Sequence, residues 1–165
     1  MRYRATASPD FVSRHFGHGV TPDNVEALVA QADVVVDAID VTGRAGLEMK
    51  YLLHRVCRRQ YKPVVCGYDM AAAQYIPVFD YRNPDLQVLG GLLGAEQVAT
   101  LDPLQACTYL VPVECVPLEM YAELDRHLAG KDYTSQLGIA AHLFGTLATA
   151  LILDLSTAAR CATPS

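Results

Sequence analysis

Asp40 is the residue of this 165-residue chain whose position best suits ligand chemistry. It follows the apolar run ADVVVDAI at residues 32–39, which is typical of a strand buried on both faces of a parallel sheet. A carboxylate at the carboxyl end of such a strand faces the crevice in which α/β proteins bind ligands. An equally good interpretation is that Asp40 caps the helix expected from Arg44. Asp37 would point to the opposite face of a regular strand, so we do not expect it to be a ligand.

The cysteines and histidines are weaker candidates. Cys107 and Cys115 lie in an irregular region where a nucleophile could stand, although buried, unreactive thiols are commoner. His15 and His18 are spaced like a metal pair, but residues three apart on a strand point to opposite faces. No two of the five cysteines form a Cys-x-x-Cys pair, so we expect no zinc site and no disulfide framework, but reduced thiols in a cytoplasmic protein.

The elements that would position these residues alternate between helix and strand. Helices are predicted at residues 22–31, 44–60, 118–128 and from about residue 135 to about residue 157. Strands are predicted at residues 11–16, 32–39, 64–66, 74–81 and 108–113. This order indicates a single α/β domain over residues 1–165, with parallel strands, right-handed crossovers and an antiparallel extension that Pro77 places at an edge.

Composition limits the classes of function. The chain is 52% hydrophobic and 19% charged, which is enough apolar material for a sizeable core. Its net charge of -5 disfavours nucleic-acid binding. The apolar segment at residues 137–155 contains His142 and Asp154 and lacks basic anchors, so we expect a buried helix and no membrane span.

An ordered set of segments resembles the ThiF/MoeB/HesA family, relatives of the ubiquitin-activating enzymes. The set consists of ADVVVDAID, a long helix, and then KPVVCGYDMAAAQYIPVFDY. The family's Pro-Val-Val-x-Gly strand and the strand after it are matched by Pro63, Val64, Val65, Gly67, Val78, Phe79 and Tyr81. The segment HGVTPDNVEALVAQAD and the closing helix QLGIAAHLFGTLATALILDL are also similar to family elements. The resemblance implies a partial Rossmann-like domain with a long apolar helix at its end.

The family activates a carboxylate with ATP and magnesium. The carboxylate, often the C-terminus of a ubiquitin-like or sulfur-carrier protein, attacks the α-phosphate and forms an acyl-adenylate and pyrophosphate. The resemblance implies that Asp40 positions magnesium and phosphate, with Arg44 near the family's helix-start arginine but one residue short; a solvated residue at the start of the helix is an equally good interpretation of Arg44. It also implies that Asp69, and Gln74 beyond it, flank a turn where substrate tails dock, and a solvated turn is an equally good interpretation there. Val41 stands where the family usually has asparagine, which weakens the expected nucleotide site.

The glycine-rich phosphate loop of that family is missing from this sequence, together with its phosphate-binding lysine and arginine. The family's two zinc-binding Cys-x-x-Cys pairs are also missing. Without the first strand–helix–strand portion, the strand at residues 32–39 would lose its central neighbour and present an apolar edge. We therefore expect that this edge is covered. The cover is a partner chain that carries the missing half, the second copy in a homodimer, or a strand of a rearranged sheet.

Two hypotheses for the function follow. The chain is either part of an adenylyltransferase that is inactive without the missing half, or a degenerate, non-catalytic module for dimerisation or scaffolding. Asp40 favours the first hypothesis and Val41 the second. A third possibility, a dinucleotide-binding Rossmann protein, is disfavoured by the missing glycine fingerprint.

Overall fold

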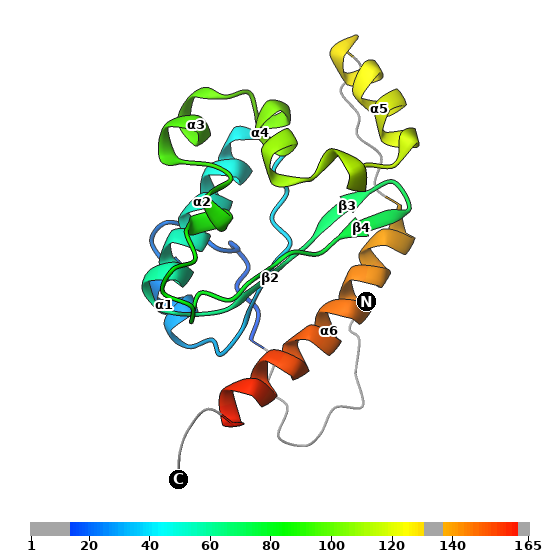
Figure 1. Ribbon diagram of the computed structural model, residues 1–165. Coiled ribbons are helices and arrows are strands. Elements are labelled where there is room, and N and C mark those ends of the chain that lie inside the picture. Colours follow the sequence, from blue (N-terminus) through cyan, green and yellow to red (C-terminus); the bar gives the residue numbers. More distant parts are fainter. Residues whose placement is uncertain (1–13, 131–136, 162–165) are drawn as a thin grey trace.

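The computed structural model describes residues 14–130 and 137–161, in which short strands lie among helices (Figure 1). The α-helices are α1 (Val25–Ala30), α2 (Arg44–Arg59), α3 (Ala95–Thr100), α4 (Pro103–Leu110), α5 (Leu118–Leu128) and α6 (Gly138–Cys161). The strands are β1 (Val35–Asp37), β2 (Val64–Cys66), β3 (Tyr68–Met70), β4 (Ala73–Tyr75) and β5 (Val78–Phe79). Two 3-10 helices, η1 (Val88–Gly91) and η2 (Val113–Cys115), join the later elements.

A three-stranded sheet has the order β1–β2–β5. β1 and β2 are parallel, with Val35 opposite Val64 and Asp37 opposite Cys66, and α2 connects them along the chain. β5 is antiparallel to β2, with Phe79 opposite Val64. The predicted α/β fold with parallel strands and an antiparallel extension is therefore confirmed at this level.

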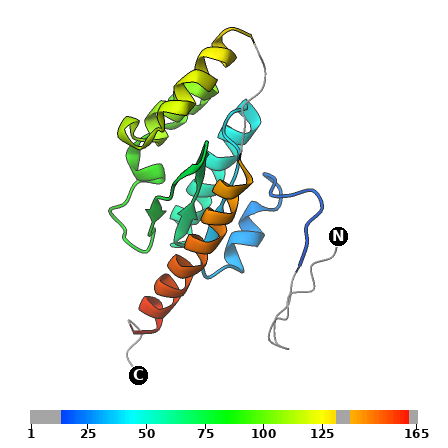
Figure 2. The same cartoon turned by 90° about the vertical axis from the view of Figure 1, so that its right-hand side faces the viewer.

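Helices cover both faces of the sheet (Figure 2). Because side chains alternate along a strand, Val64 and Cys66 enter the main core beside α2, whereas Val65 packs against Phe144 and Ala148 of α6 on the other face. The main core contains the buried apolar side chains of α1 and α2, which are Val25, Val29, Leu47, Leu53, Val56 and Cys57.

Two glycines let α2 begin directly beside the loop that follows β1. Gly43 is the N-cap, with an extended backbone. Gly46 packs so tightly that a Cβ atom there would lie 1.8 Å from the carbonyl oxygen of Asp40. At its other end α2 is followed by Tyr61, whose φ of 54° is left-handed, and by Pro63. The helix predicted at residues 44–60 is confirmed to within one residue.

The chain after β2 differs from the predicted single strand at residues 74–81. β3 and β4 form an antiparallel hairpin that turns at Ala71, whose φ is 51°. β4 then ends before Pro77, and β5 begins after it. Although Pro77 cannot donate a hydrogen bond, its carbonyl accepts one from the Cys66 amide at 3.0 Å, so the strand switches sheets at this residue.

The strand predicted at residues 108–113 is wrong, because α4 occupies this region up to Leu110. Asp102 caps the helix by accepting a hydrogen bond from the Leu104 amide at 2.9 Å, and Pro103 suits the first turn. These start signals outweigh the β-branched residues that follow.

The beginning of the chain also differs from the prediction. No strand forms at residues 14–16, and the rest of the strand predicted at residues 11–16 lies outside the described residues. Asn24, not Thr21, is the N-cap of α1, because the Asn24 side chain accepts a hydrogen bond from the Thr21 amide at 2.8 Å and holds residues 21–24 in a turn.

α6 contacts the sheet along one narrow stripe. Its buried residues are Ala140, Phe144 and Ala148. Large apolar side chains on its other faces are exposed, namely Ile139, Leu143, Leu147 and Leu153. The expectation of a buried helix is therefore wrong for most of its surface. Residues 138–157 are long and apolar enough to cross a membrane, but core helices pass the same test, so this is weak evidence for a membrane. The capping residues predicted at Thr134 or Ser135 lie outside the described residues.

β1 lies at the edge of the sheet. In the described part of the chain it pairs with β2 alone, and the Val36 side chain is 44% exposed. An apolar strand with an unpaired edge is a site for association with another chain. The structure thus agrees with the expected open edge beside residues 32–39.

Gly67→Ala is expected to loosen the contact between α6 and the sheet. The added Cβ atom would lie 2.6 Å to 2.8 Å from three carbons of the Phe144 ring. Such overpacking costs about 1–3 kcal/mol, so we expect a lower melting temperature and faster amide exchange along α6. Gly17→Ala, where a Cβ atom meets nothing within 4 Å, is the matched control. Adding Phe144→Leu to Gly67→Ala should recover part of the loss, and unchanged exchange along α6 would contradict the contact.

Candidate functional site

A cavity of about 450 Å³ opens where β1 and β2 end. This is the edge at which α/β sheets bind ligands, and the volume is in the range of small-molecule sites. The loop after β1, strand β3 with the preceding Gly67, and α4, η2, α5 and α6 all contribute to it. The lining residues are Ala38, Ile39, Asp40, Val41, Thr42, Gly67, Tyr68, Asp69, Met70, Leu104, Cys107, Thr108, Val111, Val113, Val116, Met120, Tyr121, Ala141 and Phe144.

The buried lining residues are mainly apolar. Val41, Met70, Phe144 and Tyr68 are each less than 9% exposed. The Tyr68 hydroxyl is fully buried beside the Cys66 thiol. Burial, together with this thiol, raises the pKa of the phenol, so it stays protonated.

Two carboxylates lie on the cavity, and the lining residues include no lysine, arginine or histidine. Asp40 is exposed, and its Oδ1 atom accepts hydrogen bonds from the Thr42 amide at 2.9 Å and hydroxyl at 2.8 Å. Asp69 is half-buried and accepts a hydrogen bond from Gln74, and burial raises the pKa of its carboxyl group. The cavity therefore carries negative charge.

Of the other predicted site residues, Arg44 does not line the cavity with Asp40. Its guanidinium group donates to the carbonyl oxygens of Val98 and Leu101 at the end of α3, so it serves as a helix cap and does not line the cavity.

Gln74 lies on β4, beside the cavity and not on its lining. Besides its bond to Asp69 it donates to the Ala140 carbonyl at 2.9 Å, which ties the hairpin to the start of α6. The fold thus brings Asp69 and Gln74 together, whereas Asp40 bonds to Thr42 and Arg44 to the end of α3.

A buried polar network lies between the sheet and α2, next to the cavity. At its centre the Asp37 Oδ2 atom accepts hydrogen bonds from the Lys50 ammonium group at 2.6 Å and, at 3.0 Å, from Nε2 of His54 when this atom carries the proton. All three side chains are completely buried. Asp37 Oδ1 accepts from the Ile39 amide at 2.9 Å, which fixes the loop that lines the cavity.

The network continues on both sides of Asp37. His54 Nδ1 lies 2.7 Å from the Tyr81 hydroxyl oxygen, which also accepts a hydrogen bond from the Leu89 amide at 2.9 Å. With Nε2 protonated, Nδ1 is the acceptor and Tyr81 the donor. On the other side the Lys50 ammonium group lies 4.8 Å from the centre of the Tyr68 ring, so the network also supports the cavity wall.

Burial and charge set the protonation states of the network. Burial alone would raise the pKa of Asp37, but the bond from His54 and the Lys50 charge hold it at about 2. The pKa of Lys50 is raised because the attraction of Asp37 exceeds the effect of burial. Burial lowers the pKa of His54, despite its bond to Asp37. At neutral pH the network therefore contains one carboxylate, one ammonium and one neutral imidazole.

Asp37, His54 and Cys66 place ligand-type atoms within 4.8 Å of one another, as a metal site would. The Lys50 ammonium group lies among them, 3.1 Å from the Cys66 sulfur. Burial raises the pKa of the Cys66 thiol to about 11, so it is not the thiolate that metals bind. In this cluster the positive charge is therefore supplied by the Lys50 ammonium group and not by a metal ion.

The thiol candidates receive little support as nucleophiles. Cys107 is half-buried on the cavity, and burial with the nearby Asp40 charge raises its pKa to about 11, which keeps it protonated. Cys115 is exposed in η2 and does not line the cavity.

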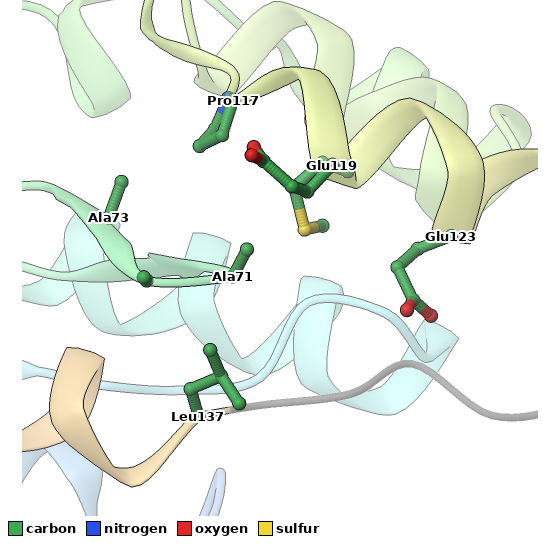
Figure 3. A pocket seen from close by; sticks show the side chains of 8 residues that line it. Ala71, Ala73, Pro117, Glu119, Glu123 and Leu137 are labelled. Atoms are coloured by element: carbon green, nitrogen blue, oxygen red, sulfur yellow. The ribbon is translucent and has the colours of Figure 1, made fainter.

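A second hollow, of about 520 Å³, lies between the β3–β4 turn, α5 and the start of α6 (Figure 3). Ala71 and Ala73 of the turn and Leu137 face the α5 residues Glu119 and Glu123 across it. It has no buried polar group aimed at a ligand among its lining residues, so the cavity at the strand ends is the better candidate.

Fold and site together define an α/β protein with a ligand-sized, acidic cavity at the carboxyl ends of a parallel strand pair. Compared with known proteins, the chain matches no protein family, no curated protein and no solved structure. Its function is therefore inferred from the cavity and from the sequence resemblance.

Lys50→Met is expected to destabilise the fold by about 3–5 kcal/mol, because Asp37 would remain as a buried charge without its main partner. Urea unfolding of the purified variant measures this loss. Arg55→Met, on the exposed side of the same helix, is the control and should change little. The double variant Asp37→Leu with Lys50→Met should lose less than the sum of the single losses. Additive losses would contradict the ion pair.

Acidification below the ordinary histidine pKa of 6.5 is expected to lower the free energy of unfolding through His54. The pKa of His54 is lower in the folded chain, so between the two pKa values the unfolded chain binds a proton that the folded chain does not. Denaturant unfolding at pH 7.5 and pH 5.5 checks this loss. His54→Asn should flatten the dependence, whereas His142→Asn on the exposed side of α6 should keep it; an unchanged slope in His54→Asn would refute the assignment.

Proposed function

We propose that the chain is part of an adenylate-forming domain of the ThiF/MoeB/HesA type, which activates a carboxylate with ATP and magnesium. The observation that carries this proposal is the cavity at the carboxyl ends of β1 and β2, with Asp40 on its lining. The second oxygen of Asp40, Oδ2, accepts no hydrogen bond from the described residues, which leaves it for a magnesium ion that accompanies ATP.

The charge of the cavity indicates that this part of the domain does not suffice for the reaction. Attack of a carboxylate on the α-phosphate of ATP releases pyrophosphate, and positive charge is needed to stabilise this leaving group. No lysine, arginine or histidine is among the described residues that line the cavity, and Arg44 is engaged at the end of α3. In this proposal the phosphate-binding groups come from a glycine-rich strand–helix unit, on a partner chain or a longer form of this chain, that pairs with the open edge of β1.

The carboxylate substrate is either the C-terminus of a ubiquitin-like or sulfur-carrier protein or a small acid. In this proposal the tail of such a substrate binds beside Asp69, which lines the cavity and accepts a hydrogen bond from Gln74. Homodimerisation is the second way to cover the β1 edge and the exposed face of α6.

The second candidate function is a degenerate, non-catalytic module for dimerisation or scaffolding. It is favoured by Val41, which is 6% exposed and packs in the core where the family usually has a polar residue. This alternative predicts no ATP binding even in the complete assembly.

Pyrophosphate exchange into ATP tests the proposal. The chain is assayed together with the carboxylate that attacks ATP, which is a sulfur-carrier protein or a small acid, and with a glycine-rich strand–helix unit. This unit is supplied as sequence encoded ahead of Met1 or as a co-expressed chain. Asp40→Asn keeps an oxygen for the Thr42 bonds and removes the charge, so exchange should fall about 100-fold. The control is Asp33→Asn, an exposed residue before the opposite end of β1. Equal exchange by both variants would exclude the assigned role of Asp40.

The present chain alone is expected to bind no ATP. Titration calorimetry with ATP and magnesium should give no heat, because the chain has no phosphate loop and the cavity has no cation. Tight binding would show that the missing loop is not needed, and no exchange in the complete assembly would favour the non-catalytic module.

A further inference from the structure

The lining of the cavity at the strand ends restricts the kind of molecule that fits it. Its volume of about 450 Å³ suits a small organic ligand. Its buried walls are mainly the side chains of Val41, Met70 and Phe144, so an apolar body gains most from burial there. A peptide tail of glycines would instead bury amide groups against walls that offer them few partners.

The charged groups of the cavity point to a cation. Asp40 and Asp69 both line it, and no basic residue is among the described residues that do. A bound anion would meet like charge, whereas an ammonium group would be attracted.

We propose that the cavity binds a small amphiphilic amine, with its aromatic or branched apolar body inside and its ammonium group beside Asp40 and Asp69. The inference rests on the proposed function only for what happens to the bound ligand. If the domain forms adenylates, this ligand is its carboxylate substrate, an acid that also bears an amino group and an apolar side chain. The amine-binding step itself needs neither ATP nor a partner.

Two probes of matched size test the preference for a cation. Protein-detected NMR at neutral pH follows the titration of the chain with 2-phenylethylammonium and with 3-phenylpropanoate. The ammonium probe should bind at least about tenfold more tightly, because only the sign of its charge suits Asp40 and Asp69. Its shifts should lie in the loops that follow β1 and β2. Equal affinities, tighter binding of the carboxylate, or no binding of either probe up to 20 mM would overturn the proposal.

Conservative variants locate the ammonium group. Asp40→Asn and Asp69→Asn should each weaken binding of 2-phenylethylammonium several-fold, because each removes a charge and keeps an oxygen acceptor. Asp33→Asn, before the opposite end of β1, should bind as the wild type does. If neither variant on the cavity weakens binding, the assignment of the two carboxylates is wrong, whatever the outcome of the exchange assay.

Discussion

The ion pair between Asp37 and Lys50 is the interaction on which the arrangement of sheet, helix and cavity depends. Both side chains are completely buried, and burial of two charges costs more than their attraction returns unless hydrogen bonds satisfy the remaining polar atoms. Here they do, because Asp37 also accepts from His54 and from the Ile39 amide. One carboxylate therefore fixes the end of β1, the inner face of α2 and the first turn of the loop that lines the cavity.

This network gives two aspartates of one segment different environments. Asp37 points into the interior, where the His54 bond and the Lys50 charge outweigh desolvation and keep it ionised. Asp40, three residues later, is exposed on the cavity. The interior carboxylate is fully occupied by protein groups, so it is structural, and the exposed carboxylate is the one that a ligand can reach. The Lys50 ammonium group beside the Tyr68 ring connects the two regions.

Those parts of the fold that depend on local signals could be predicted from the sequence. β2 and α5 match their predicted bounds. Lys62-Pro63 and Gly67 mark the two ends of β2, and Gly130 marks the end of α5. The network could not be predicted, because a lysine and a histidine in a helix indicate a solvated face unless the partner is known. Their spacing with Leu47 and Cys57 was the available signal, since these four positions share one face of α2. Arg44 bonds to Val98 and Leu101, which follow it by 54 and 57 positions, and no local sequence pattern indicates contacts over such a separation.

In the part of the chain that the structure describes, the open edge of β1 and the missing positive charge of the cavity occur at the same place, because Asp40 follows the strand whose edge is unpaired. A parallel strand that paired with β1 would satisfy the peptide groups of that edge and end beside Asp40. A helix that began after this strand would direct the positive end of its dipole and its free amides at the cavity. A single added strand–helix unit would thus supply both the backbone partner that β1 lacks and the charge that phosphate chemistry requires. A partner that covered the edge with an antiparallel strand would leave the cavity acidic, and the chain would remain a receptor for cations.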